Sequence, residues 1–289
     1  MAFVKPRSIP GLVFGMALMV MFGVGAVAES PAPHSVAGAE NLVDGAAKTA
    51  TAGSRLLLPW FEVDTNDPNG ITTLFAVRNE GTTATDIEIA YHQTDVPQDP
   101  QVLDPVRLGP KEIKTVNIRL VPGLSSDAEG FIRGYVLITS TDGGSLAGDT
   151  FQITPGDNFA NGSRLLNVGP ESPNNELCNL FSIRFLNGGG FDSGTVYSIW
   201  VDLPLAPDGT DPVLDALAYD QAGNLLIARE IFADQVAFQI SANDVLSPVN
   251  ENFGAIEIQF RDGAVGTLGA TLDASGRYSV GFAATCGDP

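Results

Sequence analysis

The stretch TDIEIAYHQ, residues 85–93, alternates apolar and polar side chains along its length. In an extended chain Ile87, Ile89 and Tyr91 fall on one face, whereas His92 falls on the other. An alternation with period two is typical of a half-buried strand in an antiparallel sheet. The stretch therefore predicts a strand whose isoleucines and tyrosine lie in a core.

The same pattern recurs along the chain, and turn residues separate the segments. The other alternating stretches are TVYSIWVDL (195–203), VAFQIS (236–241), FGAIEIQF (253–260) and RYSVGFA (277–283). Sequences such as DPNG at 67–70 and NGGG at 187–190 supply turns between strands. Many short strands joined by Gly, Pro and Asp turns predict an all-β protein of antiparallel β-sandwiches, Ig-like or jelly-roll-like.

A loose internal repeat suggests two such sandwiches in tandem. TTLFAVRNEG (72–81) is similar to CNLFSIRFLNGG (178–189), and the stretch 114–138 is similar to 236–260. A single larger two-sheet fold is the alternative. The expected organisation is a signal peptide at 1–28, a flexible tether at 29–53, and sandwich domains at 54–168 and 177–289.

The N-terminal segment has the layout of a secretory signal peptide. Lys5 and Arg7 precede an uncharged, mostly apolar run, which closes on the small-residue triplet Ala26-Val27-Ala28. Cleavage after Ala28 would place the mature protein in the periplasm or the medium. The run is also long enough to span a bilayer, so an uncleaved membrane anchor is the alternative.

The net negative charge of the chain disfavours some classes of binding partner. The formal charge is −19, and it becomes −21 if Lys5 and Arg7 leave with the leader. A surface this acidic repels phosphate backbones and anionic lipid headgroups, so we expect neither nucleic-acid binding nor peripheral membrane binding.

Two cysteines, Cys178 and Cys286, are the only ones in the chain. An even number of cysteines in an exported chain favours a disulfide. Each flanks a strand-like segment, at the start and at the end of the second predicted domain. If the first and last strands of that domain pair antiparallel, the two cysteines meet and close the domain.

The opening segment of the first predicted domain, SRLLLPWFEVDTNDPNGITTLFAVRNEGTTATDIEIAYH (54–92), resembles that of exported bacterial tandem β-sandwich (Ig-like) proteins of unknown function. The likeness covers about 40 residues and is generic. It implies a surface-exposed sandwich, and it carries no activity and no site residues.

The turn DTNDPNG (64–70) is a candidate calcium site, because it crowds hard oxygen ligands on one loop. Its four candidate ligands are Asp64, Asn66, Asp67 and Asn69. The spacing does not fit an EF-hand, and the alternative is a plain Asx-Pro-Asn-Gly hairpin turn. Apart from Ca²⁺ we expect no cofactor.

Trp200 is the candidate ligand-binding residue. In TVYSIWVDL it shares the polar face of its strand with Ser198 and Asp202, where an indole ring can stack on a sugar or a protein partner. Burial between the two domains, or under a loop, is the alternative.

The sequence favours no catalytic residue. It has two histidines, His34 and His92, and lacks a G-x-S-x-G elbow, and no one pair stands out among its 34 carboxylates. We therefore expect an exported, non-catalytic protein that binds a glycan or a surface protein, or that has a structural role. Secreted glycan cleavage by an Asp/Glu pair and calcium-dependent adhesion are the alternatives.

Overall fold

The structure, a computed structural model, describes residues 53–94, 100–157, 159–169, 176–187, 194–202, 213–232, 236–249, 251–261, 264–274, 278–283 and 285–286. The predicted signal peptide and nearly all of the predicted tether lie outside these ranges. All of the described residues belong to one compact unit. The predicted domain boundaries stay a prediction, and we refer to residues 53–169 as the N-terminal half and 176–286 as the C-terminal half.

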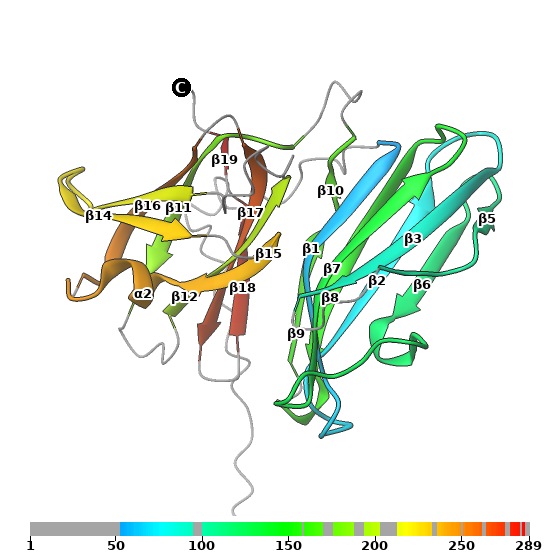
Figure 1. The fold of residues 1–289 in the computed structure, drawn as a ribbon, viewed down its shortest axis with the longest axis horizontal. Coiled ribbons are helices and arrows are strands. Elements are labelled where there is room, and N and C mark those ends of the chain that lie inside the picture. Colours follow the sequence, from blue (N-terminus) through cyan, green and yellow to red (C-terminus); the bar gives the residue numbers. More distant parts are fainter. Residues whose placement is uncertain are drawn as a thin grey trace, which may run out of the picture. The chain divides into compact units, whose positions relative to one another are not determined.

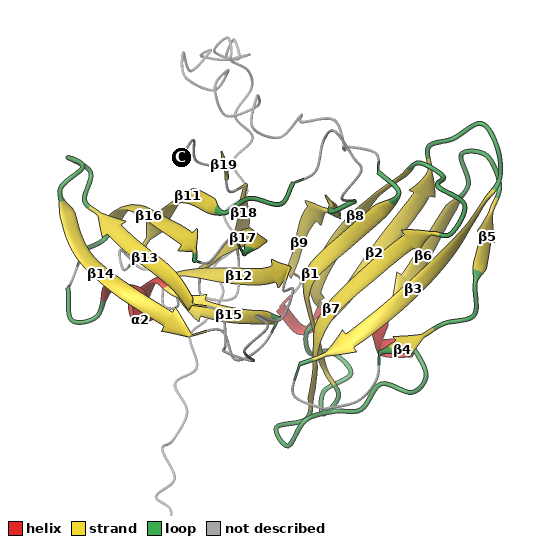
Figure 2. Ribbon diagram, turned by 45° about the horizontal axis from the view of Figure 1, so that its top comes forward, coloured by secondary structure: helices red, strands yellow, loops and turns green. Residues whose placement is uncertain are grey.

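The described residues are nearly all strand, which confirms the all-β sandwich class (Figure 1, Figure 2). In the N-terminal half, one sheet, which we call sheet I, has the order β6-β2-β8-β9, and a second, sheet II, has the order β10-β1-β7-β3 with β4 and β5 paired to β3. The elements of this half are β1 (Arg55–Asp64), β2 (Thr72–Asn79), β3 (Thr85–Gln93), β4 (Gln101–Val102), β5 (Val106–Leu108), β6 (Ile113–Asn117), η1 (Ile118–Leu120), β7 (Phe131–Ser140), β8 (Leu146–Thr154), η2 (Pro155–Asp157), β9 (Phe159–Arg164) and β10 (Leu166–Asn167).

The C-terminal half contains sheet III, with the order β15-β12-β17-β18, and sheet IV, with the order β14-β13-β16-β11-β19. All strand pairs in both halves are antiparallel within the described residues. The elements of this half are β11 (Leu180–Leu186), β12 (Gly194–Asp202), β13 (Val213–Tyr219), β14 (Leu225–Phe232), β15 (Ala237–Ser241), α2 (Ala242–Leu246), β16 (Phe253–Phe260), β17 (Val265–Ala274), β18 (Tyr278–Ala283) and β19 (Thr285–Cys286).

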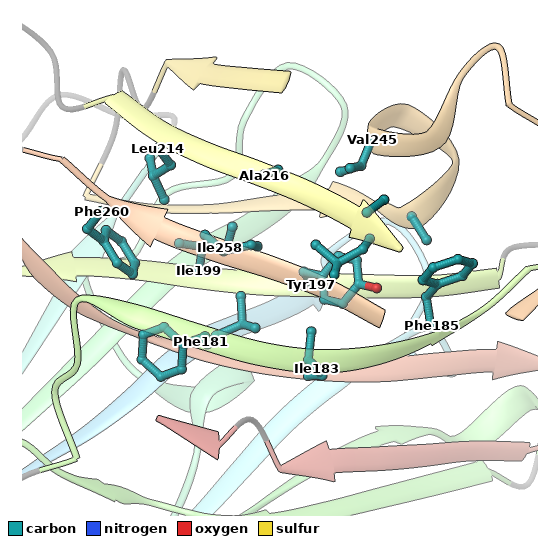
Figure 3. Packing of buried hydrophobic residues seen from close by; sticks show 14 of the residues in the cluster. Phe181, Ile183, Phe185, Tyr197, Ile199, Leu214, Ala216, Val245, Ile258 and Phe260 are labelled. Atoms are coloured by element: carbon teal, nitrogen blue, oxygen red, sulfur yellow. The ribbon is translucent and has the colours of Figure 1, made fainter. Parts of the chain in front are cut away.

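Each half has its own apolar core, and the alternating residues of 85–93 and 253–260 lie in it where the pattern places them. Ile87, Ile89 and Tyr91 are buried between sheets I and II. Ile256 and Ile258 are buried between sheets III and IV, in the cluster that Figure 3 shows. A two-residue period commits one whole face of each strand to the core, so these positions follow from the sequence alone.

The two halves have the same strand order. Reading β1 as β11, β2 as β12, β3 as β13, β6 as β15, β7 as β16, β8 as β17, β9 as β18 and β10 as β19 turns sheet I into sheet III and sheet II into sheet IV. These eight strands thus recur in the same arrangement, whereas β4 and β5 beside β3 have only β14 beside β13 as their counterpart.

Hydrogen bonds on the second strand of each half fix the residue equivalence. The Thr73 hydroxyl donates to the carbonyl of Glu62 and accepts from its N–H, both at 3.0 Å. The Thr195 hydroxyl makes the same two bonds to the backbone of Leu186, at 3.0 and 2.9 Å. Thr73 and Thr195 are therefore equivalent, and both are buried.

A pair of glycines supports the same alignment. Gly134 lies opposite Phe61 and Gly254 lies opposite Phe185. A Cβ atom at Gly134 would collide with the carbonyl oxygen of His92, and one at Gly254 with that of Tyr219. Both positions need glycine because a neighbouring strand approaches the backbone closely.

The sequence repeat agrees with this duplication only in part. The segments 114–138 and 236–260 do cover equivalent elements, although the match is two residues out of register: Asn117 caps η1 and Ser241 caps α2, each at the end of an equivalent strand. The first proposed match is wrong by one strand, because 72–81 forms β2 whereas 178–189 contains β11. The structural partner of TLFAVRN (73–79) is TVYSIWV (195–201). Alternating strands resemble one another, so the sequence alone could not separate the two alignments.

The cysteines meet as the sequence predicts. Cys178 and Cys286 are paired, with their Cα atoms 5.8 Å apart, a separation that suits a disulfide. The last strand, β19, pairs antiparallel with the first strand of the half, β11, and sets Cys286 opposite Phe181. This is the arrangement expected from the first-and-last-strand argument.

A third apolar cluster joins the outer faces of sheets II and III, and we call it the junction. Its buried members are Leu57, Val168, Trp200 and Ala237, with Trp60, Tyr135, Leu137, Leu166, Leu177 and Val236 partly buried against them. Two hydrogen bonds also join the end of the N-terminal half to the start of the C-terminal half. The N–H of Asn167 donates to the Glu176 carboxylate, and the N–H of Glu176 donates to the Asn167 carbonyl oxygen, both at 2.8 Å.

Candidate functional site

Trp200 is buried at the junction, so the expectation of an accessible indole on a polar sheet face is corrected. Its side chain is 2% exposed, and it packs with residues of β1, β7 and β15. Trp200 does lie on the face opposite Tyr197 and Ile199, as the alternation of its strand predicts. That face is covered by the N-terminal half, which the strand's own sequence does not reveal. Trp200 therefore cannot stack on a sugar in this structure.

An aromatic stack crosses the junction. The His92 ring lies parallel to the Tyr135 ring with centroids 4.4 Å apart, and the Tyr135 ring meets Trp200 edge-on at 6.2 Å. Burial, with a smaller contribution from the positive charge of Arg55, lowers the pKa of His92 below its usual range. His92 is thus a half-buried packing residue and not the solvated strand histidine that the sequence suggested.

Both indole N–H groups at the junction are buried without a hydrogen-bond partner among the described residues. They belong to Trp60 and Trp200. An unpaired buried donor costs free energy, so neither ring is held by its polar atom. The two tryptophans join the halves through apolar contact alone.

The turn at 64–70 forms the Asx-type hairpin that was the alternative to calcium. The Asp64 Oδ1 atom accepts from the N–H groups of Asn66 and Asp67, at 2.8 and 3.2 Å. Asp67 in turn accepts from the N–H of Asn69 at 2.8 Å. The Asn66 amide donates to the carbonyl of Glu129 at 2.9 Å. The side chains of the candidate ligands Asp64, Asn66 and Asp67 thus form hydrogen bonds that shape and anchor the loop.

Arg119 supplies the positive charge at this turn. Its guanidinium donates to the carbonyl oxygens of Asp64 and Asp67, at 2.6 and 3.2 Å, and to those of Gly70 and Ile71, at 3.1 and 3.0 Å. Five donors in a rigid fork suit such a cage of carbonyl oxygens. Sequence reasoning missed Arg119, because it lies about 50 positions from the turn and no local pattern marks it.

No group of three or more His, Cys, Asp or Glu side chains among the described residues is arranged to hold a metal ion. Calcium binding at Asp64, Asn66, Asp67 and Asn69 stays a prediction. The geometry favours the arginine-bound hairpin, because the inward oxygens of the loop already have a cationic partner.

Several carboxyl groups have a pKa below the usual range of their residue type. Hydrogen bonds from Arg261 lower the pKa of Asp215, and hydroxyl donors on Thr85 and Ser140 lower that of Asp142 to about 2. At Asp127 partial burial opposes the shift, but backbone N–H groups and the charge of Arg133 outweigh it and lower the pKa. A glycosidase acid needs the opposite shift. The pKa values of Asp215, Asp142 and Asp127 are lowered, so these three carboxyl groups do not have the shift that such an acid needs.

The outward faces of sheets I and IV carry exposed apolar side chains. Ile113 and Phe151 on sheet I are 57% and 44% exposed, and Leu225 and Phe253 on sheet IV are 56% and 43% exposed. Strand register places all four on the face turned away from the core of their own half. These faces are the equivalents of the two that meet at the junction.

No protein-family model, curated protein or solved structure matches this chain. None of the helices in the described ranges has the length and apolar character that crossing a bilayer requires.

Proposed function

We propose that the mature chain is an exported, non-catalytic binding or structural protein of the cell surface or the periplasm. The observation that carries the proposal is the duplicated sandwich, which is fastened internally and leaves two sheet faces with exposed apolar side chains. The junction holds the halves together, and the pair Cys178–Cys286 closes the second half. A scaffold of this kind suits contact with glycans or other proteins.

Export is part of the proposal and rests on two features. The layout of residues 1–28 is that of a cleaved leader, and the paired cysteines suit an oxidising compartment. We expect the N-terminus of the protein isolated from cells to be Glu29. We also expect alkylation of the unreduced, denatured protein to label neither cysteine. A mature chain that still begins at Met1, or labelling of both thiols, would contradict export by this route.

The function is tested by incubating the mature protein with fragments of its own cell envelope and with the exopolysaccharide of the same cells. We expect it to sediment with one of them and to release no reducing sugar from a polysaccharide panel. Release of reducing sugar that depends on a single Asp or Glu would replace this proposal with the glycan-cleaving alternative. No retention on either fraction would remove the surface role.

A further inference from the structure

The duplication makes each free face the equivalent of a face that is already docked. Sheet I corresponds to sheet III and sheet IV corresponds to sheet II. At the junction, the outer face of sheet III lies against the outer face of sheet II. The outer faces of sheets I and IV therefore have the strand order of the two faces that meet at the junction, and they belong to different halves of the chain.

The residue equivalence shows what each free face carries at the docking positions. Because Thr73 aligns with Thr195, Arg78 stands where sheet III has Trp200. Ile113, opposite Arg78 on the edge strand, stands where sheet III has Ala237. The free face of sheet I thus offers a cation beside an exposed isoleucine.

The free face of sheet IV also differs from its docked equivalent, the outer face of sheet II. Because Gly134 aligns with Gly254, Ala255 stands where sheet II has Tyr135, and Glu257 stands where it has Leu137. The apolar pairing of Trp200 with its leucine and tyrosine neighbours becomes a potential pairing of Arg78 with Glu257. At these two positions both sides have exchanged an apolar group for a charge, and the two charges are of opposite sign. The same alignment places the exposed Arg184, opposite Ala255, where sheet II has Trp60, so Glu257 attracts Arg78 while Arg184 opposes it.

We propose that the outer face of sheet I in one copy docks onto the outer face of sheet IV in a second copy, repeating the internal junction between chains. The contact is heterologous, so each copy keeps one unused face of each kind and the assembly is an open, head-to-tail chain. The partner is a second copy of this protein. Four of the six large hydrophobic side chains that are exposed among the described residues lie on these two faces.

The contact is weaker than the junction. A partly solvated Arg–Glu pair contributes less than a buried tryptophan, and Arg78 already forms an ion pair with Glu80 that it must share. Self-association should therefore depend on protein concentration and be reversible. The inference rests on the proposed structural role. It gives that role a mechanism, because copies that dock head to tail would build an extended assembly of sandwiches.

Sedimentation velocity of the mature, unreduced protein over a range of concentrations tests the docking. We expect the weight-average mass of the wild type to rise with concentration. Ile113→Glu blocks the sheet I face and Ala255→Glu blocks the sheet IV face, so each variant alone should stay monomeric. An equimolar mixture of the two should give dimers and nothing larger, because only one intact pair of faces remains.

The controls separate this contact from others. Leu120→Glu, at a 76% exposed position outside both faces, should leave self-association unchanged. The charge reversals Arg78→Glu and Glu257→Arg should each weaken self-association, and their combination in one chain should restore it. Circular dichroism checks that every variant keeps its strand content.

A wild type that is monomeric at every concentration overturns the docking, as does a mixture of the two blocked variants that stays monomeric. A closed wild-type dimer that does not grow overturns it as well. These results leave the proposed function untouched, since retention on the cell envelope is measured separately. Conversely, release of reducing sugar would end the structural role without altering the sedimentation result.

Discussion

The edge of the Tyr135 ring meets the Trp200 ring across the junction, with centroids 6.2 Å apart. One ring belongs to β7 of the N-terminal half and the other to β12 of the C-terminal half. The contact joins residues 65 positions apart. Each side of the contact can be changed separately.

Trp200→Ala should destabilise the protein by about 3–5 kcal/mol, because it removes a buried aromatic ring and leaves a cavity. Trp200→Phe should cost much less, because the indole N–H has no partner to lose among the described residues. Urea unfolding measures both variants. Equal losses for the two substitutions would show that the N–H group, and not apolar packing, holds the ring.

Tyr197→Phe should leave stability unchanged or raise it by about 1 kcal/mol, since it removes a hydroxyl that is buried without a hydrogen-bond partner in the described core (Figure 3). Burial raises the pKa of this phenol well above its usual range, so the group is neutral at any working pH. Thermal unfolding checks the effect, with Tyr91→Phe as the matched change in the other core. A loss of more than about 1 kcal/mol would mean that the hydroxyl is paired.

Arg119→Ala should destabilise the protein by about 2–3 kcal/mol, because it leaves the carbonyl oxygens of the 64–71 turn without their charged donor. Arg119→Lys should recover only part of this loss, since an ammonium group lacks the planar fork. Arg107→Ala, which removes an exposed ion pair with Asp86, is the control and should cost less than about 1 kcal/mol.

Calcium binding at the 64–70 turn can be tested by its effect on the melting temperature. With Arg119 in place, we expect Ca²⁺ to leave the melting temperature of the wild type unchanged. A rise in melting temperature that Asp64→Asn abolishes would establish the calcium site that the sequence suggested, and would show that the ion displaces or joins the arginine.

His92 should make stability fall as the solution is acidified below about pH 6.5. Burial and the nearby Arg55 lower its pKa in the folded state, so the unfolded chain takes up a proton first and is favoured as the pH drops toward the folded pKa. His92→Gln should remove this slope. The free energy of unfolding at pH 7 and at pH 5.5 measures it, and His34 lies outside the predicted sandwiches. A slope that survives in the variant would assign it to other groups.

Local pattern was enough to predict much of the fold. Strand alternation placed Ile87, Ile89 and Ile256 in the cores, and the flanking positions of Cys178 and Cys286 led to their pairing. These results follow because a strand's inward face is set by a two-residue period and the cysteines mark the first and last strands of one half. The candidate ligand-binding site fared worse, because exposure of Trp200 depends on what covers the outer face of its sheet.

The sequence by itself determined the strands, their buried faces, the acidic surface and the partners for its two cysteines, because each depends on composition or on neighbours along the chain. Only the tertiary structure decided that Trp200 is covered, that Arg119 fills the turn at 64–70, and that Thr73 repeats the role of Thr195. These three depend on contacts between segments far apart in sequence. No local pattern encodes which distant surface a given face will meet.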